Sequence, residues 1–295
     1  MEYVHYPVMR NEILSLLVPQ QDEAEMVDCT TGEGGHTLLF LNKYPKLHIT
    51  GLDRDIAIQK KAIERLKEFG TRFSPVNTWF DDYFTDYKGP GLDLVLFDLG
   101  ISSFHFAESE RGFSFLKDEE LDMRLDRNAP ISAEDVVNGY PEDKLANVIY
   151  EFGEERYSRR IAKAIVFQRR LKRIRTSTEL ARIIYEAVPP QYKHGHIHPA
   201  TRSFQAIRIE VNRELDRIEP AVSGAVDALK KGGRLAVISF HSLEDRPVKW
   251  LFKRLADGDD PKIRILTKKP LVPTEEESTE NAPSRSAKLR VIEKL

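Results

Sequence analysis

The chain has 295 residues, and its 45 lysines and arginines against 47 aspartates and glutamates give a net charge of −2. This length suffices for one large domain or for a domain with an insertion. The composition is that of an ordinary globular protein, and no apolar run approaches the roughly 18 residues that a membrane helix needs. The start lacks the basic and then apolar pattern of a signal peptide, and the single cysteine, Cys29, excludes an internal disulfide. We therefore expect a cytoplasmic protein without a membrane partner.

The first predicted elements are a helix over 11–17, capped by Asn11, and a short strand that ends at Asp28. A glycine-rich turn follows, Gly32-Glu33-Gly34-Gly35-His36-Thr37, and leads into an apolar helix over 38–44. This order of elements lets the backbone approach a nucleotide-like ligand closely, because glycine has no Cβ and accepts positive φ. On its own the turn could equally be an ordinary one.

A second short strand, 47–52, leads to Asp53. An acid about 20 residues beyond the glycines can bind ribose hydroxyls, although a solvated acid at a strand end is the alternative. Two features favour S-adenosylmethionine (SAM) over a dinucleotide: Asp28 precedes the glycines, and Thr37 stands where the third glycine of G-x-G-x-x-G would be. An acid-flanked loop suits a sulfonium with an amino-acid tail better than an anionic pyrophosphate.

A helix over 55–69 and a strand over 73–77 come next. Trp79 and Phe80 follow this strand, and either ring could lie against an adenine or pack in the core.

The clearest strand is 92–98, which is almost continuously apolar and ends at Asp98. Alternating strands and helices predict a mostly parallel α/β sheet, whose ligands bind at the carboxyl ends of the strands. Asp28, Asp53 and Asp98 would then converge on one crevice.

The next hundred residues contain no convincing strand, and we predict helices over 142–152, 156–172, 176–187 and 201–217. This pattern predicts an inserted all-α region and three divisions of the chain: 1–106, 107–212 and 213–295.

The segment 156–175 carries nine arginines and lysines and no acid. Ile161, Ala164, Ile165 and Leu171 recur at helical spacing, which predicts an apolar stripe under a basic face. A solvated helix face is the simpler interpretation, but contact with RNA phosphates is favoured. The candidate RNA-binding residues are Arg156, Arg159, Arg160, Lys163, Arg169, Arg170 and Arg202.

The histidines at 194, 196 and 198 could suggest a metal site. Because no acids or cysteines support them, a loop or RNA-facing role is favoured, and no metal is expected.

The sheet is predicted to resume with a strand over 234–240, which ends in His241-Ser242-Leu243-Glu244. Two final strands, 263–266 and 289–292, are predicted as an antiparallel pair. Between them, residues 273–287 are rich in Glu, Ser and Pro, which is typical of a mobile segment.

Taken together, these blocks resemble the bacterial 16S rRNA (cytosine-N4)-methyltransferase family of the RsmH/MraW type, over nearly the whole chain. Besides the glycine turn, the resemblance is carried by His5–Met9, Asp53-Arg54-Asp55, Asp98-Leu99-Gly100-Ile101-Ser102-Ser103, Glu110-Arg111-Gly112-Phe113-Ser114-Phe115, Leu121-Asp122-Met123-Arg124, Gly153-Glu154-Glu155-Arg156, His198-Pro199-Ala200-Thr201-Arg202 with Phe204-Gln205-Ala206 and Arg208, Ser239-Phe240-His241-Ser242-Leu243-Glu244-Asp245-Arg246 and Arg285-Ser286-Ala287-Lys288-Leu289-Arg290.

The resemblance implies a class I SAM-dependent methyltransferase fold, a Rossmann-like, mostly parallel seven-stranded sheet with an inserted all-α substrate domain. It implies SAM as cofactor, and methylation of a cytidine in the decoding region of 16S rRNA in the small ribosomal subunit. The implied SAM contacts are Gly34, Gly35, His36, Asp53, Phe80, Asp98 and His105. The chain departs from the family at Phe104-His105, where Pro-Gln is usual, and at Pro283, where an arginine is usual.

A cytosine N4 amine is a poor nucleophile, because its lone pair is delocalised into the ring, so the enzyme must align it and accept its proton. The candidate catalytic residues are Asp98, Ser102, Ser103, His241, Ser242 and Glu244. Simple turn hydrogen bonding is the alternative for the two serines. A NAD-dependent oxidoreductase and a non-catalytic RNA-binding protein remain as rival functions, and a homodimer is compatible with the sequence.

Overall fold

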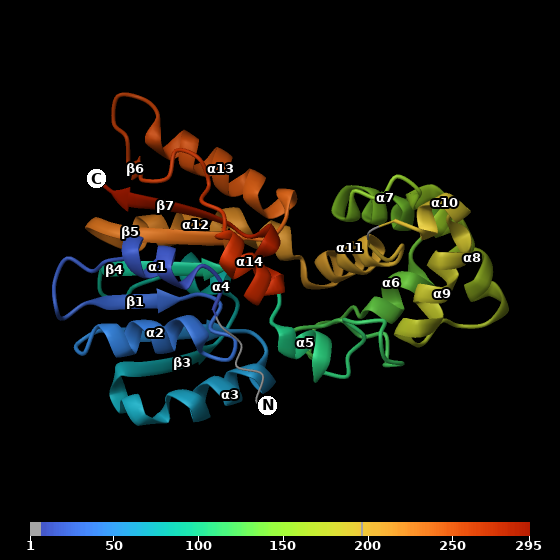
Figure 1. Ribbon diagram of the computed structural model, residues 1–295, viewed down its shortest axis with the longest axis horizontal. Coiled ribbons are helices and arrows are strands. Elements are labelled where there is room, and N and C mark those ends of the chain that lie inside the picture. The colour runs from blue at the N-terminus through green and yellow to red at the C-terminus, as the bar shows by residue number, and fades with distance from the viewer. Residues whose placement is uncertain (1–6, 196) are drawn as a thin grey trace. The chain divides into compact units, whose positions relative to one another are not determined.

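Two compact units make up the protein in a computed structural model that describes residues 7–195 and 197–295 (Figure 1). The first comprises Met1–Ile101 and Leu215–Leu295, and the second comprises Ser102–Glu214. The terminal His5 and the central histidine at 196 lie outside the described residues.

The first unit is built on a mostly parallel sheet, which confirms the predicted fold class. Among the described residues it has seven strands in the order β3-β2-β1-β4-β5-β7-β6, and only β7 runs antiparallel to its neighbours. The strands are β1 (Glu25–Asp28), β2 (His48–Asp53), β3 (Phe73–Asn77), β4 (Leu92–Asp98), β5 (Leu229–Ser239), β6 (Ile263–Ile265) and β7 (Lys288–Lys294). The predicted bounds of β3 and β4 are confirmed, as is the antiparallel final pair.

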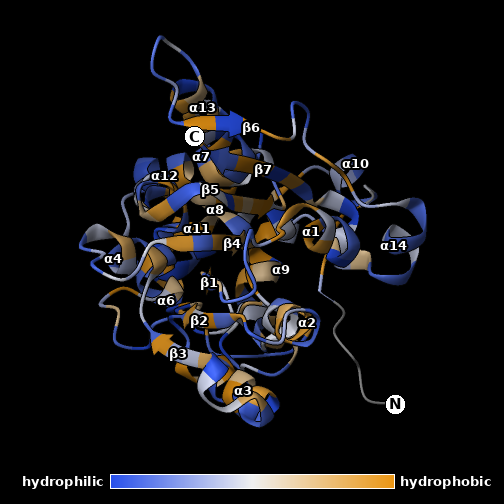
Figure 2. Ribbon diagram, turned by 90° about the vertical axis from the view of Figure 1, so that its left-hand side faces the viewer, coloured by the Kyte–Doolittle hydropathy of each residue, from blue (hydrophilic) through white to orange (hydrophobic). Residues whose placement is uncertain are grey.

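Helices cover both faces of this sheet, because its buried strands present apolar side chains alternately to each side (Figure 2). In β4, Leu94 and Leu96 belong to one core cluster, and Val95 and Phe97 belong to the other. The first cluster includes residues of α1 (Arg10–Leu16), α2 (Gly35–Lys43) and α3 (Ile56–Leu66). The second includes residues of α4 (Phe80–Thr85), α12 (Glu214–Ala228) and α13 (Ser242–Ala256).

The glycine turn connects β1 to α2 and depends on Gly34. This residue is the N-cap of α2 with φ at 80°, a left-handed conformation that costs an L-residue energy. A Cβ at this position would lie 2.9 Å from Cδ1 of Leu66 in α3. Gly34 therefore lets α2 begin close to α3.

The second unit is helical in its described part. Its helices are α5 (Ser103–Ala107), α6 (Ala133–Gly139), α7 (Glu142–Gly153), α8 (Ser158–Leu171), α9 (Ser177–Ala187), α10 (Pro190–Lys193) and α11 (Thr201–Asn212). Capping boxes start α6 and α9: the Ser132 side chain pairs with Asp135, and the Thr176 side chain pairs with Glu179. The helix predicted over 176–187 is confirmed.

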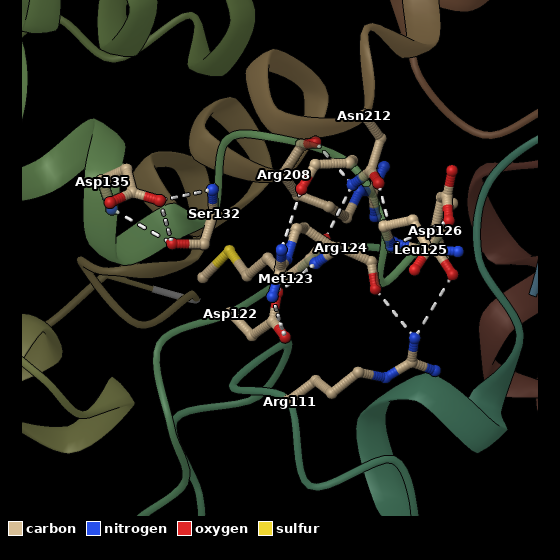
Figure 3. Close-up of polar contacts among 12 residues, drawn as sticks. Arg111, Asp122, Met123, Arg124, Leu125, Asp126, Ser132, Asp135, Arg208 and Asn212 are labelled. Carbon is tan, nitrogen blue, oxygen red and sulfur yellow. Dashed lines mark hydrogen bonds and ion pairs between the residues drawn. The ribbon is translucent and has the colours of Figure 1, made fainter.

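A polar cluster fixes the long loop between α5 and α6 onto α11 (Figure 3). The Asn212 amide donates to the carbonyl of Met123 at 2.8 Å and accepts from the Leu125 backbone at 2.8 Å. The Arg111 guanidinium donates to the Arg124 carbonyl at 2.8 Å. Met123 itself has a φ of 56°. The blocks around Arg111 and Met123 therefore shape the loop of this unit.

Several predicted elements differ from the structure. Helix α1 begins at Arg10 rather than after an Asn11 cap, because Met9 precedes it in a left-handed conformation. The predicted helix 201–217 breaks at Arg213, whose φ is 52°, so α11 ends and α12 begins there. Strand β5 starts five residues earlier than predicted and includes the Gly232-Gly233 pair.

The segment predicted to be mobile, 273–287, contains helix α14 (Glu275–Glu280) and a 3₁₀ turn (Ala282–Ser286). Thr274 caps α14 by accepting from the Glu277 backbone. Leu171 was placed on a buried stripe but is 70% exposed, and the stripe of α8 consists of Ile161, Ala162, Ile165 and Val166. None of the helices within the described ranges has the length and apolarity needed to cross a membrane.

Gly34→Ala should destabilise the first unit by about 1–2 kcal/mol or more, because it adds strain at a positive φ. The added Cβ also crowds Leu66. Chemical unfolding of the two proteins measures this difference. Gly139→Ala is the matched control, since a Cβ there meets nothing within 4 Å. Equal losses in the two variants would contradict the role given to Gly34.

Candidate active site at the carboxyl edge of the sheet

Three aspartates end three neighbouring strands of the first unit. Asp28 is the last residue of β1, Asp53 of β2 and Asp98 of β4, and β1 pairs in parallel with both of the other strands. The predicted convergence of these acids at one edge of the sheet is therefore confirmed. Each carboxylate has a different set of partners.

Asp28 is 1% exposed and ties the glycine turn to its strand. Its Oδ2 accepts from the Thr37 hydroxyl at 2.7 Å, and its Oδ1 accepts from the Thr30 backbone at 3.2 Å. Burial raises the pKa of Asp28, and these hydrogen bonds oppose the increase. Thr37, which replaces the third glycine of a dinucleotide fingerprint, thus supplies a partner that a glycine could not.

Asp53 reaches across to the glycine turn. Its Oδ2 accepts from the Gly32 backbone at 2.9 Å, and its Oδ1 accepts from the Asp55 backbone at 2.8 Å. Burial raises the pKa of Asp53 to about 7 in spite of these bonds. Each carboxylate oxygen keeps a further lone pair, so binding of ribose hydroxyls by Asp53 stays a prediction.

Of the three acids, Asp98 has the carboxylate with the fewest hydrogen-bond partners among the described residues. Its backbone N–H donates to the Thr30 hydroxyl at 2.7 Å, and its Oδ2 lies 3.5 Å from Nδ1 of His36. Its Oδ1 is buried and has no hydrogen-bond partner within residues 7–195 and 197–295. Burial raises the pKa of Asp98 to about 6, and the charge of His36 works against this increase. A buried acceptor without a partner favours a ligand that donates to it.

His36 was predicted to be a polar SAM contact, but it is 6% exposed and has protein partners. Its Nε2 lies 2.9 Å from the Val8 carbonyl, and its Nδ1 faces Asp98. Gly34 and Gly35 next to it form the first turn of α2. Gly34 is buried and Gly35 is half-buried, and the SAM contacts of Gly34, Gly35 and His36 stay predictions.

Of the two aromatic residues after β3, Trp79 is covered by Arg217, whose guanidinium lies 4.1 Å from a Trp79 ring centroid. Arg217 also pairs with both carboxylate oxygens of Asp81 at 2.8 Å. Phe80 is half-buried and packs edge-on against Phe97 at 5.6 Å. Phe80 is the less encumbered of the two rings, and its contact with adenine stays a prediction.

The polar residues after β5 form the start of α13. Glu244 is 2% exposed; its Oε2 accepts from the Phe240 backbone at 2.7 Å, and its Oε1 lies 3.0 Å from Nε2 of His241. Glu244 therefore serves as a helix cap in this arrangement. Its charge also raises the pKa of Asp98, so the two carboxylates lie near each other. Contact of His241 or Ser242 with a base stays a prediction.

Ser102, Ser103 and His105 belong to the second unit. The Ser102 hydroxyl accepts from the Phe104 backbone at 3.2 Å as the N-cap of α5, which favours the turn interpretation for this serine. His105 is buried edge-on between Phe104 and Phe113. The catalytic roles of the serines and the SAM contact of His105 stay predictions.

The basic residues of the second unit differ in what they contact. Arg159, Arg160, Lys163 and Arg170 are exposed along α8, as is the Phe167 ring between them. Four candidates have partners within the unit: Arg159 donates to the Asp143 carbonyl at 3.5 Å, Arg169 to the Val137 carbonyl and Arg202 to the Glu154 carbonyl, and Arg156 lies over the Tyr157 and Tyr192 rings.

An open pocket in the second unit was not predicted. It has a volume of about 290 Å³ and is lined by Phe115, Thr178, Ala181, Arg182, Tyr185 and His198. The His198 ring lies 4.6 Å from Phe115 and is stacked on Tyr185 at 5.8 Å. Burial lowers the pKa of His198, which favours the neutral ring. Phe115 and His198 are too far in sequence from the four lining residues around α9 for spacing to reveal the pocket.

Asp53→Asn should flatten the dependence of the unfolding free energy on pH. The folded-state pKa of about 7 lies above the ordinary value of 3.8, so the folded protein retains a proton that the unfolded chain has lost. The contribution of Asp53 to stability therefore falls as pH rises from about 4 to 7. Denaturant unfolding at several pH values measures it, with the exposed Asp82→Asn as control. Parallel curves for Asp53→Asn and wild type would contradict this assignment.

Comparison with known proteins gives the same assignment over the full chain. The model of the MraW methylase family matches residues 2–295. Proteins named ribosomal RNA small subunit methyltransferase H are similar to this chain: that of Treponema denticola is 47% identical over 100% of this chain and 98% of its own length, and that of Persephonella marina is 48% identical over 99% of each. With a sheet that collects three acids beside a glycine turn and a family match of this extent, the chain belongs to the MraW methylase family.

Proposed function

We propose that this protein transfers a methyl group from SAM to the exocyclic N4 amine of one cytidine in the decoding (P-site) region of 16S rRNA. Its relatives carry the name of small-subunit rRNA methyltransferases. The observation that carries the proposal is the buried, unpartnered Oδ1 of Asp98 at the carboxyl edge of the sheet, within residues 7–195 and 197–295. An amine N–H is the kind of donor that this acceptor lacks.

The residues at this edge fit SAM. A sulfonium cation is favoured near several carboxylates, which disfavour an anionic pyrophosphate, and this argues against the NAD-dependent alternative. Gly34 and Gly35 would hold SAM through their backbone groups. Asp53 would bind the ribose hydroxyls of SAM, and the Phe80 ring would lie against its adenine. SAM supplies an electrophilic methyl group.

Asp98 would act on the target amine. With a pKa of about 6 it is mainly ionised at neutral pH, so Oδ1 can accept an N–H hydrogen bond from the amine. This bond would orient the amine for attack and stabilise the positive charge that develops on it. His241 and Ser242, at the start of α13, are the further candidates for contact with the base.

The second unit would bind the RNA. The exposed basic residues of α8, Arg159, Arg160, Lys163 and Arg170, are suited to phosphates. The pocket between Phe115, His198 and Tyr185 offers stacking surfaces for an unpaired base, with Arg182 at its side.

Mass mapping of small-subunit RNA tests the proposal in cells that carry the wild-type gene, an Asp98→Ala gene or no copy. We expect the N4-methyl mark on one cytidine with the wild type only. The proposed function would be overturned if the cytosine were unmodified in wild-type cells, or if it were equally modified in all three kinds of cells. A mark that survives Asp98→Ala would remove Asp98 from the reaction and leave the function in place.

Tyr185→Ala should weaken binding of small-subunit RNA by about 1–3 kcal/mol, because it removes one stacking surface of the pocket. Tyr150→Ala is the matched control, since Tyr150 is an exposed tyrosine of the same unit that does not line the pocket. Filter binding at fixed salt measures both affinities. Equal effects of the two substitutions would exclude the pocket as a base-binding site.

A further inference from the structure

We propose that His36 is a positioning residue for Asp98, and that Glu277 of α14 supports it through the peptide group between Val8 and Met9. This inference rests on the proposed function, because it assigns the residues that orient the acceptor of the target amine. It gives a role to the segment 273–287, which the sequence alone predicts to be mobile.

The orientation of the His36 ring follows from its partners. A carbonyl oxygen can only accept, so Nε2 of His36 donates its proton to the Val8 carbonyl at 2.9 Å. Nδ1 is then directed at Oδ2 of Asp98, 3.5 Å away, and this contact with an ionised carboxylate is attractive when Nδ1 carries a proton as well, as in the imidazolium form. At this distance the second contact is mainly electrostatic rather than a short hydrogen bond. It engages Oδ2 and leaves Oδ1 as the free acceptor.

The Val8–Met9 peptide group is held from two sides. Its carbonyl accepts from His36, and its N–H donates to Oε1 of Glu277 at 2.6 Å. Met9 adopts a φ of 53°, so this peptide lies in a strained region of the backbone that needs such support. Because a peptide unit is planar, fixing its N–H also fixes the direction of its carbonyl. Hydrogen bonds in such a chain polarise one another.

A connected series of contacts therefore runs from α14 to the candidate active site: Glu277, the Val8–Met9 peptide, His36 and Asp98. Its members come from sequence positions 8, 9, 36, 98 and 277 and all belong to the first unit. The alternative is that His36 only anchors the N-terminal segment, in which case its contact with Asp98 has no effect on the reaction.

Two conservative substitutions separate these roles. In His36→Asn the amide stands near the position of Nδ1 and can still donate to Asp98, but it does not reach Val8. In His36→Gln the amide reaches the Val8 carbonyl but leaves Asp98 without its partner. We expect His36→Gln to lower kcat by up to about 100-fold, the cost of a misplaced catalytic group, with KM for SAM nearly unchanged. His36→Asn should retain more of kcat.

The support from α14 is tested by Glu277→Ala, with Glu276→Ala on the exposed side of the same helix as the matched control. We expect Glu277→Ala to lower kcat and Glu276→Ala to leave it unchanged. Glu277→Gln keeps an oxygen that can accept from Met9 and should restore activity. Thermal unfolding of each variant identifies any that fail to fold.

Nitrogen-15 spectra of the histidine rings give a readout that does not need RNA. We expect His36 to carry protons on both Nε2 and Nδ1, with an Nδ1 signal that shifts in Asp98→Asn and in Glu277→Ala. A His36 protonated on one ring nitrogen alone, or kcat higher in His36→Gln than in His36→Asn, would overturn the inference. If wild-type enzyme methylates no small-subunit RNA, the proposed function fails, and the spectra alone decide the inference.

Discussion

The gathering of three carboxylates at one sheet edge is the constraint on which the rest of the first unit depends. Like charges at close range raise one another's pKa, and burial adds to the effect. Hydrogen bonds stabilise the charged form of two of these carboxylates. Asp28 accepts from a hydroxyl and a backbone N–H, and Asp53 accepts from two backbone N–H groups. Asp98 instead faces a histidine and keeps one acceptor unused. The glycine turn is shaped by the same need, because it supplies two of these partners.

Local patterns in the sequence predict this edge well. The apolar run before Asp98 and the spacing from the glycines to Asp53 are properties of neighbouring residues, and parallel pairing then brings the strand ends together. Local patterns could not predict the residues that support this edge or line the pocket, because these residues come together only in the folded chain. Val8 contributes only a backbone oxygen, Glu277 lies in a segment of low-complexity composition, and Tyr185 and Phe115 meet only in the folded second unit.

Motif residues of the second unit have a different meaning from the one their chemistry suggests. Arg111 looks like a polar group available to a substrate, yet it hydrogen-bonds the backbone of the loop around Met123, as Asn212 does. The Ser102 hydroxyl likewise caps α5, and in the first unit Glu244 accepts from the Phe240 backbone at the start of α13. Side-chain type indicates what a residue can bind, whereas its backbone surroundings decide whether that capacity is still available.

The hydroxyl of Thr37 has a consequence for attempts to change cofactor preference. In dinucleotide-binding folds the third glycine lets helix and strand approach by removing a side chain. Here α2 is held to β1 by a bond from Thr37 to buried Asp28. Introducing a glycine at 37 would leave that carboxylate short of a partner instead of opening room for a pyrophosphate. Conversion to a dinucleotide site would have to remove the acid and the threonine together, so the two positions form one unit of specificity.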